Sequence, residues 1–233
     1  MTKRYSSAST EAGFSLIELL IAMGITLVIL GLVSSMLASS FTIRARETRR
    51  SQAIADAQRA LNLMSREIAN AGVGLNTNGI VAGDSNLTSI RIRSNLDAFL
   101  LFSSAVSPDQ VTNDEHEDIK YRLINDANGK YLIRQNIQPS LSTAVFANPV
   151  DDLKIRYFNQ KVAWTTTNVD SCDITLPAGA AEEANKTLVK YVVISVCVNL
   201  PEVGTPGVAG YQPPSRTQLV SDVVLRNTNL SSY

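Results

Sequence analysis

One carboxylate, Glu18, lies just inside the N-terminal end of a long run without charged residues, Leu19–Leu37. A carboxylate inside a bilayer costs about 2.5–3.5 kcal/mol at the centre of the membrane, and less near its surface. Such a residue either pairs with a cation as part of a function, or it lies at a helix end and reaches back to the headgroups. Its position alone leaves both interpretations open.

The chain has two cysteines, Cys172 and Cys197, both late in the sequence. In an oxidising compartment the two would form one disulfide, which closes a loop of about 25 residues and contributes about 3 kcal/mol. The alternative is a pair of free thiols, with Cys197 as a small residue of a strand. The pair is too small a set to indicate a disulfide-rich scaffold.

Few residues could support catalysis or bind a metal. An acidic stretch lacks the spacing of a calcium loop, and we expect a solvated charged face; its members are Asp109, Asp114, Glu115, Glu117 and Asp118. The single histidine, His116, cannot form a zinc site by itself, and we expect it in a solvated loop. The sequence has no G-x-S-x-G, H-E-x-x-H or P-loop motif. We therefore expect no enzyme and no cofactor.

A single long helix is predicted to carry Glu18. The run Leu19–Leu37 can cross a bilayer of about 30 Å as a helix of about 20 residues. After a polar stretch, apolar residues recur at spacings of three and four, which predicts a one-sided helix; they are Ile54, Ala57, Leu61, Met64, Ile68 and Ala71. We expect this stripe to pack on the domain that follows rather than in an intermolecular coiled coil. A helix from Phe14 to Ala71, ended by Gly72 and Gly74, would be about 87 Å long.

Short extended runs separated by turn residues follow the helix. They predict strands at 87–94, 97–104, 117–124, 130–137, 151–158, 161–167, 186–200 and 217–227. Asn128-Gly129 predicts one hairpin, and Asn159-Gln160 predicts a second, between 151–158 and 161–167. The predicted fold is α+β: a long N-terminal helix, comprising a membrane span and a stem, packed on a mostly antiparallel β-sheet head.

Charge is divided unevenly along the chain although the net formal charge is zero. Residues 1–75 carry eight Lys/Arg and five Asp/Glu (+3), and residues 76–233 carry thirteen and sixteen (−3). Neither half indicates a nucleic-acid partner. The arginines that follow the span would by themselves place its C-terminal side in the cytoplasm; they are Arg44, Arg46, Arg49 and Arg50.

The sequence Gly13-Phe14-Ser15-Leu16-Ile17-Glu18, at the head of an uncharged span, resembles the N-terminus of type IV pilin-like proteins. This resemblance implies cleavage by a prepilin peptidase between Gly13 and Phe14 and N-methylation of Phe14. It further implies that Glu18 pairs with the new amine of a neighbouring subunit during assembly. The leader would lie in the cytoplasm and the head outside it, an orientation that overrides the arginine cluster.

The rest of the chain is similar, more weakly, to PilW-like minor pilins and to the related J-type pseudopilins of type II secretion. The similarity lies in 59–74, in 150–158 with Trp164 after it, and in the closing 222–227. The chain departs from major pilins in having no proline in the span, a larger head, and a cysteine pair that is not at the extreme C-terminus.

The resemblance implies four segments: a leader at 1–13, a membrane and filament-core helix at 14–43, a stem helix at 44–73, and a β-rich extracytoplasmic head at 74–233. The expected function is that of a minor pilin in type IV pilus assembly, with a pseudopilin as the alternative and a single-span periplasmic binding protein as a more remote one. Expected partners are other pilins, the prepilin peptidase, the inner-membrane assembly platform and membrane lipid.

Overall fold

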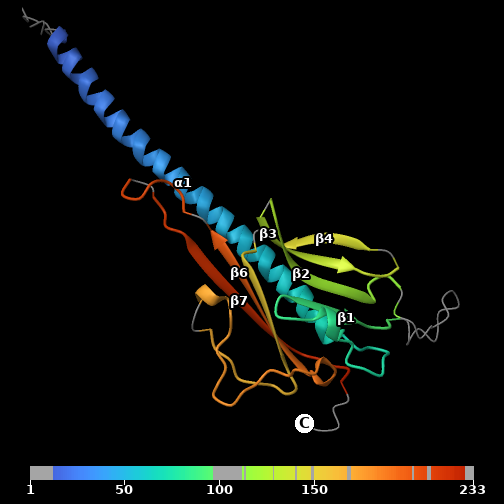
Figure 1. Cartoon of the computed structure of the whole chain (residues 1–233). Helices are drawn as coiled ribbons and strands as arrows, with labels where there is room; N and C mark the ends of the chain where they lie inside the picture. Colours follow the sequence, from blue (N-terminus) through green and yellow to red (C-terminus); the bar gives the residue numbers. More distant parts are fainter. Residues whose placement is uncertain are drawn as a thin grey trace, which may run out of the picture.

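The computed structural model describes residues 13–96, 112, 114–127, 129–139, 141–147, 150–166, 169–200, 202–208 and 211–228. The strand predicted at 97–104, Asp109 and Asn128 lie outside these residues. The helix α1 (Leu16–Ala69) has 54 residues and is about 81 Å long at 1.5 Å per residue. Figure 1 shows it as a single rod whose C-terminal half lies in the head and whose N-terminal half projects away.

The ends of α1 are close to the predicted ones. At the start, the Ser15 hydroxyl accepts a hydrogen bond from the Ile17 backbone N–H at 3.4 Å, as an N-cap residue does. The helix ends at Ala69, and Gly72 follows with a φ of 81°. A Cβ on Gly72 would lie 2.5 Å from the Thr77 backbone oxygen, so only glycine fits this turn.

The apolar stripe of the stem packs on the head, as predicted. Buried residues recur along one face of α1: Ala53, Ala57, Ala60, Leu61, Met64, Ile68 and Ala69. They belong to one hydrophobic core with residues of both sheets. Ile54, which the pattern also assigned to the stripe, is only half-buried.

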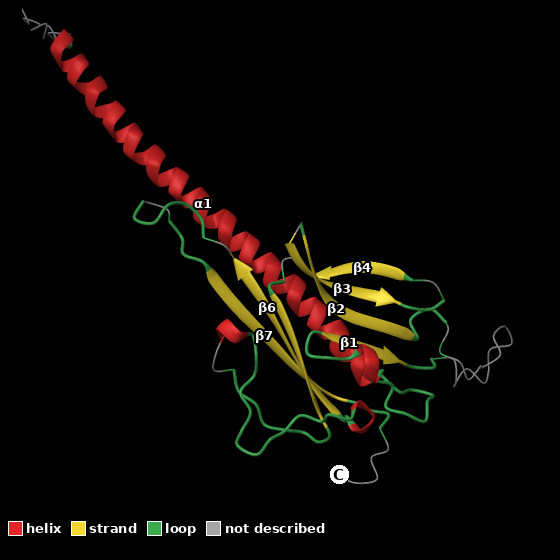
Figure 2. Ribbon diagram, viewed as in Figure 1, coloured by secondary structure: helices red, strands yellow, loops and turns green. Residues whose placement is uncertain are grey.

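The head contains two antiparallel sheets rather than one (Figure 2). The first has the order β1-β2-β3-β4, and its strands are Ser89–Arg93, Asp118–Asp126, Gly129–Asn136 and Ser142–Ala147. The predicted hairpin at Asn128-Gly129 is confirmed by the pairing of β2 with β3, in which Asp126 lies opposite Gly129. The strand β4 had not been predicted.

The second sheet has the order β5-β6-β7, with strands Asp152–Phe158, Tyr191–Leu200 and Ser215–Val224. The central strand β6 is buried on both faces, apart from Asn199. Val192, Ile194, Val196 and Val198 face the main core that contains α1. Tyr191 and Val193 face a second, smaller cluster with Phe158 and Ile174. Residues 186–188, predicted as the start of this strand, form a 3₁₀ turn.

The second predicted hairpin is wrong. The described part of this segment, 161–166, does not pair with β5, because both edges of β5 have other partners. One edge pairs with β6. On the other edge, the Ile155 N–H donates to the Leu87 oxygen at 2.7 Å, and the Tyr157 oxygen accepts from the Glu183 N–H at 2.8 Å. Thr165 instead forms an isolated bridge with Thr175.

Candidate membrane and assembly helix

The predicted processing site lies directly before α1. Gly13, Phe14 and Ser15 are not helical, and the Phe14 side chain is 84% exposed. A Cβ on Gly13 would meet no atom within 4 Å. The fold therefore does not require glycine at position 13, so a requirement for it would come from another molecule.

The N-terminal half of α1 has the properties of a membrane span. It is apolar and long enough to cross a membrane, and its most apolar window has no residue buried inside the head. Two hydroxyl groups along it donate to oxygens of the same helix: Thr26 to Ala22 at 2.7 Å and Ser35 to Leu32 at 3.0 Å. These bonds satisfy donors that would otherwise be costly in lipid.

Glu18 and the two glycines of the span are exposed. Glu18 lies in the first turn of α1, where the helix dipole favours a negative charge. Phe14 and Glu18 line the same surface hollow beside Leu19 and Ala22, so the two lie on one side of the chain end. A Cβ on Gly24 or Gly31 would meet nothing within 4 Å, which leaves room at both positions for a neighbouring helix.

A charged cluster joins α1 to the first sheet. The Glu67 carboxylate accepts hydrogen bonds from the Tyr121 hydroxyl and from Arg134, whose Nη2 lies 3.0 Å from Oε1 and whose Nε lies 3.2 Å from Oε2. Burial raises the pKa of Tyr121 well above its usual range, and the charge and hydrogen bond of Glu67 add to the shift. Burial alone would lower the pKa of Arg134, but the bonds with Glu67 raise it.

Two further contacts join α1 to the second sheet and its connections. The Ser65 and Ser221 hydroxyls lie 2.8 Å apart. Nearer the projecting half, Arg46 Nη1 donates to Gln212 Oε1 at 2.9 Å and Nη2 donates to the Pro213 oxygen. The stem is therefore fixed to the head at both ends and on two sides.

The acidic stretch is not the solvated face that we expected. Asp118 is buried and paired with Arg91 at 2.7 Å and with Arg93 at 2.9 Å. Glu117 is also buried, and its carboxylate accepts from the backbone N–H of Leu96 at 2.6 Å. Asp114 and Glu115 are exposed, as predicted.

The structure also describes His116, the other residue that we considered as a metal ligand. His116 is exposed, as predicted. Among the described residues, no group of three or more His, Cys, Asp or Glu is placed to hold a metal ion.

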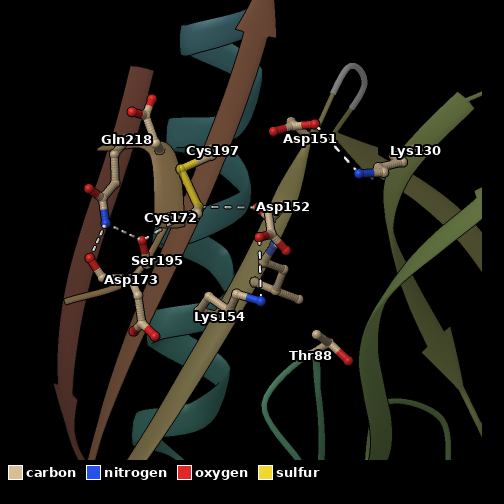
Figure 3. A network of polar contacts seen from close by, with 12 residues as sticks. Thr88, Lys130, Asp151, Asp152, Lys154, Cys172, Asp173, Ser195, Cys197 and Gln218 are labelled. Carbon is tan, nitrogen blue, oxygen red and sulfur yellow. Dashed lines mark hydrogen bonds and ion pairs between the residues drawn. A yellow bond between two sulfur atoms is a disulfide. The ribbon is translucent and has the colours of Figure 1, made fainter. Parts of the chain in front are cut away.

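Cys172 lies in the connection between β5 and β6, and it forms a disulfide with Cys197 on β6 (Figure 3). Both residues are buried. Beside the disulfide, Gln218 Nε2 donates to the Ser195 hydroxyl at 2.8 Å and to the Asp173 backbone oxygen at 3.0 Å. This network fixes the long connection between β5 and β6 against the outer face of the second sheet.

The fold and the projecting helix together define an α+β protein of pilin-like architecture. Residues 9–38 match a family model described as the prokaryotic N-terminal methylation motif, a type IV prepilin-like signal. The match indicates a pilin-like or pseudopilin-like protein, and the motif is a structural signal rather than that of an enzyme family. No match was found among the curated proteins or among the solved structures.

The residues that join α1 to the head carry only a weak signal in the sequence. Glu67 lies one position before Ile68 in the apolar stripe, and a carboxylate beside a buried stripe is a signal for a cation on the facing sheet. Arg134 and Tyr121 lie on the two strands of the predicted hairpin, but the turn residues do not fix the register that places them opposite each other. Their position depends on the pairing of β2 with β3.

Proposed function

We propose that the chain is a minor pilin or pilin-like structural subunit of a type IV pilus. In this account, a prepilin peptidase cleaves between Gly13 and Phe14, the new Phe14 amine is methylated, and the subunit passes from the inner membrane into the filament with its head in the periplasm. The observation that carries the proposal is α1 itself, half of which is fixed in the head while the other half has no partner in the described chain.

The exposed half of α1 requires an apolar environment. Fully burying one large aliphatic side chain is worth about 1.5–3 kcal/mol, and large apolar residues cover this half from Phe14 to Ile43. Lipid supplies such an environment before assembly, and the equivalent helices of other subunits supply it afterwards. The continuous, rigid helix allows the same head to be carried from one environment to the other.

Glu18 makes the packing of the helix in the filament specific for a processed neighbouring subunit. In a bundle of such helices a lone carboxylate is costly, whereas one that is paired with an α-amino group is compensated. Cleavage after Gly13 creates that amine at Phe14, and the exposed position of both residues makes them available to a neighbouring subunit. The other expected partners are the prepilin peptidase and the inner-membrane assembly platform.

A pseudopilin of a type II secretion system is the second candidate. The matched residues 9–38 cover the processing site and the span. A pseudopilin requires the same processed helix, so the same observation supports this candidate. The head would then be positioned at a pseudopilus rather than at a pilus. Assembly with the pilus proteins or with the secretion proteins in a reconstituted system separates the two.

The proposal is tested with Glu18→Ala and a matched control, Glu47→Ala, which removes an exposed carboxylate just beyond the uncharged run. We expect both variants to be cleaved and inserted in the membrane. Only Glu18→Ala should be depleted from the sheared filament fraction, because only it leaves the Phe14 amine unpaired. Equal incorporation of the two variants would reject the role of Glu18.

A further inference from the structure

Between β6 and β7, residues 202–208 and 211–214 form an arm whose two sides are joined by one isolated β-bridge. Val203 and Gln212 exchange two backbone hydrogen bonds, of 3.0 and 2.9 Å. Near the tip, the Val208 N–H donates to the Thr205 oxygen at 3.1 Å, and Gly207 has a φ of 85°. Figure 1 shows this arm beside α1 at the point where the helix leaves the head.

Arg46 attaches the arm to the helix through Gln212 and Pro213. Within residues 13–50, Ser39 and Arg46 are the two positions that are not fully exposed. They are seven residues apart, so they lie on the same face of the helix. The partial cover at Ser39 fits an arm that extends from Arg46 toward the uncharged run.

This place on the helix corresponds to the surface of a bilayer. A hydrocarbon core of about 30 Å takes about 20 residues of helix, which from Leu19 ends near Ser39. The headgroup layer adds roughly 5–7 Å, or about four residues, and so ends near Ile43. Arg46 and the arm that it holds therefore lie at the level of the headgroups and just outside them.

The exposed charged groups at this level and just outside it are three arginines and two carboxylates, Glu47 of the helix and Glu202 of the arm. The excess of positive charge suits an anionic lipid surface. Arg44, Arg49 and Arg50 are exposed, and none has an ion pair with any described residue. Guanidinium groups bind phosphate oxygens in a bidentate manner. On the arm, the Val208 side chain is 61% exposed, and Tyr211 is of the residue type that is enriched at membrane–water interfaces.

We propose that the arm and these arginines form a second membrane contact of the head. The three guanidinium groups bind the phosphates of anionic lipids, and Val208 enters the headgroup layer beside the helix. The contact fixes the tilt of the head on the membrane and is released when the subunit leaves the bilayer. The inference rests on the membrane anchoring by α1 in the proposed function, but it does not depend on the filament.

The experiment places a tryptophan at the tip of the arm. Val208→Trp is made in the full chain with Trp164→Phe, so that it is the single tryptophan. The control is Leu188→Trp in the same background, because Leu188 is 54% exposed and lies before the opposite end of β6. Both are reconstituted in phosphatidylcholine vesicles with brominated acyl chains, with and without phosphatidylglycerol, and flotation shows that each is anchored.

We expect the emission of the tryptophan at 208 to be quenched and shifted to shorter wavelength in vesicles that contain phosphatidylglycerol, and the emission at 188 to be unchanged. Adding Arg44→Gln, Arg49→Gln and Arg50→Gln should reduce the quenching at 208. Equal emission at 208 and 188 in an anchored protein would overturn the inference while leaving the proposed function intact. Failure to float would instead count against both.

A measurement on the unsubstituted chain avoids any effect of the tryptophan changes on folding. Hydrogen exchange of the segment 202–208 is compared in nanodiscs with and without phosphatidylglycerol. Slower exchange in the anionic nanodiscs supports the contact, and identical exchange in the two contradicts it.

Discussion

Arg134 binds Glu67 through two nitrogens, with Nη2 3.0 Å from Oε1 and Nε 3.2 Å from Oε2, and this pair joins the long helix to the first sheet. Both side chains are largely buried, and the Tyr121 hydroxyl donates to the same carboxylate. A largely buried charge that loses its partner is costly. The pair therefore helps to fix the direction in which α1 leaves the head, together with the buried apolar stripe and the contacts of Ser65 and Arg46.

Glu67→Gln keeps the shape of the side chain and removes its charge, leaving the Arg134 guanidinium without an anion. We expect a loss of about 2–3 kcal/mol in the free energy of unfolding of the head. Urea unfolding of the full chain in mild detergent, followed by the fluorescence of Trp164, measures this loss. The matched control is Asp56→Asn, which removes an exposed pair with Arg59 and should cost less than about 0.5 kcal/mol. Equal losses for the two variants would contradict the importance of the Glu67 pair.

Replacing Cys172 and Cys197 together by alanine should destabilise the head by about 3 kcal/mol, because the disulfide closes a loop of 25 residues in the unfolded chain. The same urea experiment measures the loss, and reduction of the native protein should reproduce it. Mass spectrometry of the exported protein provides the direct control. Two free thiols in that protein would show that the bridge does not form in the cell.

High pH should destabilise the head through Tyr191. Burial raises the pKa of Tyr191 to about 12, and the hydrogen bond that its hydroxyl donates to Asp222 adds to the shift. The unfolded chain has a tyrosine pKa of about 10, so the folded state holds the proton more tightly. The stabilisation is complete below pH 10 and is lost as the pH rises from 10 to 12.

Unfolding of the native protein and of Tyr191→Phe across this pH range tests the assignment. The variant should lose less stability between pH 10 and 12, because the remaining loss comes only from the other buried tyrosines. Burial also raises the pKa of Tyr157 well above its usual range. Parallel pH profiles of the two proteins would show that Tyr191 does not contribute.

The elements with strong local signals could be predicted from the sequence. The spacing of Leu61, Met64 and Ile68 defines one buried face of a helix, and the residues that form it are buried in the structure. The hairpin of β2 and β3 followed from Asn128-Gly129 between two extended runs. These features depend on neighbours in the sequence, and local patterns are sufficient for them.

The errors concern contacts between distant parts of the chain. The segment 161–167 has the composition of a strand, but β5 is bonded on both edges by residues far from it in sequence, including Leu87 and Val193. The strand β4 was missed because it is short. Its β-branched and aromatic residues, Thr143, Val145 and Phe146, lie between two prolines and are a local signal for a strand. Asp118 appeared solvated because Arg91, its partner, lies 27 residues away on a neighbouring strand.

The mature N-terminus tests the central claim most directly. The full chain is expressed with and without a prepilin peptidase, and the mass of the membrane-bound protein is measured. We expect the protein made with the peptidase to begin at Phe14, and to carry one added methyl group when the methylating activity is present. Retention of residues 1–13, or cleavage at a position after Phe14, would contradict it.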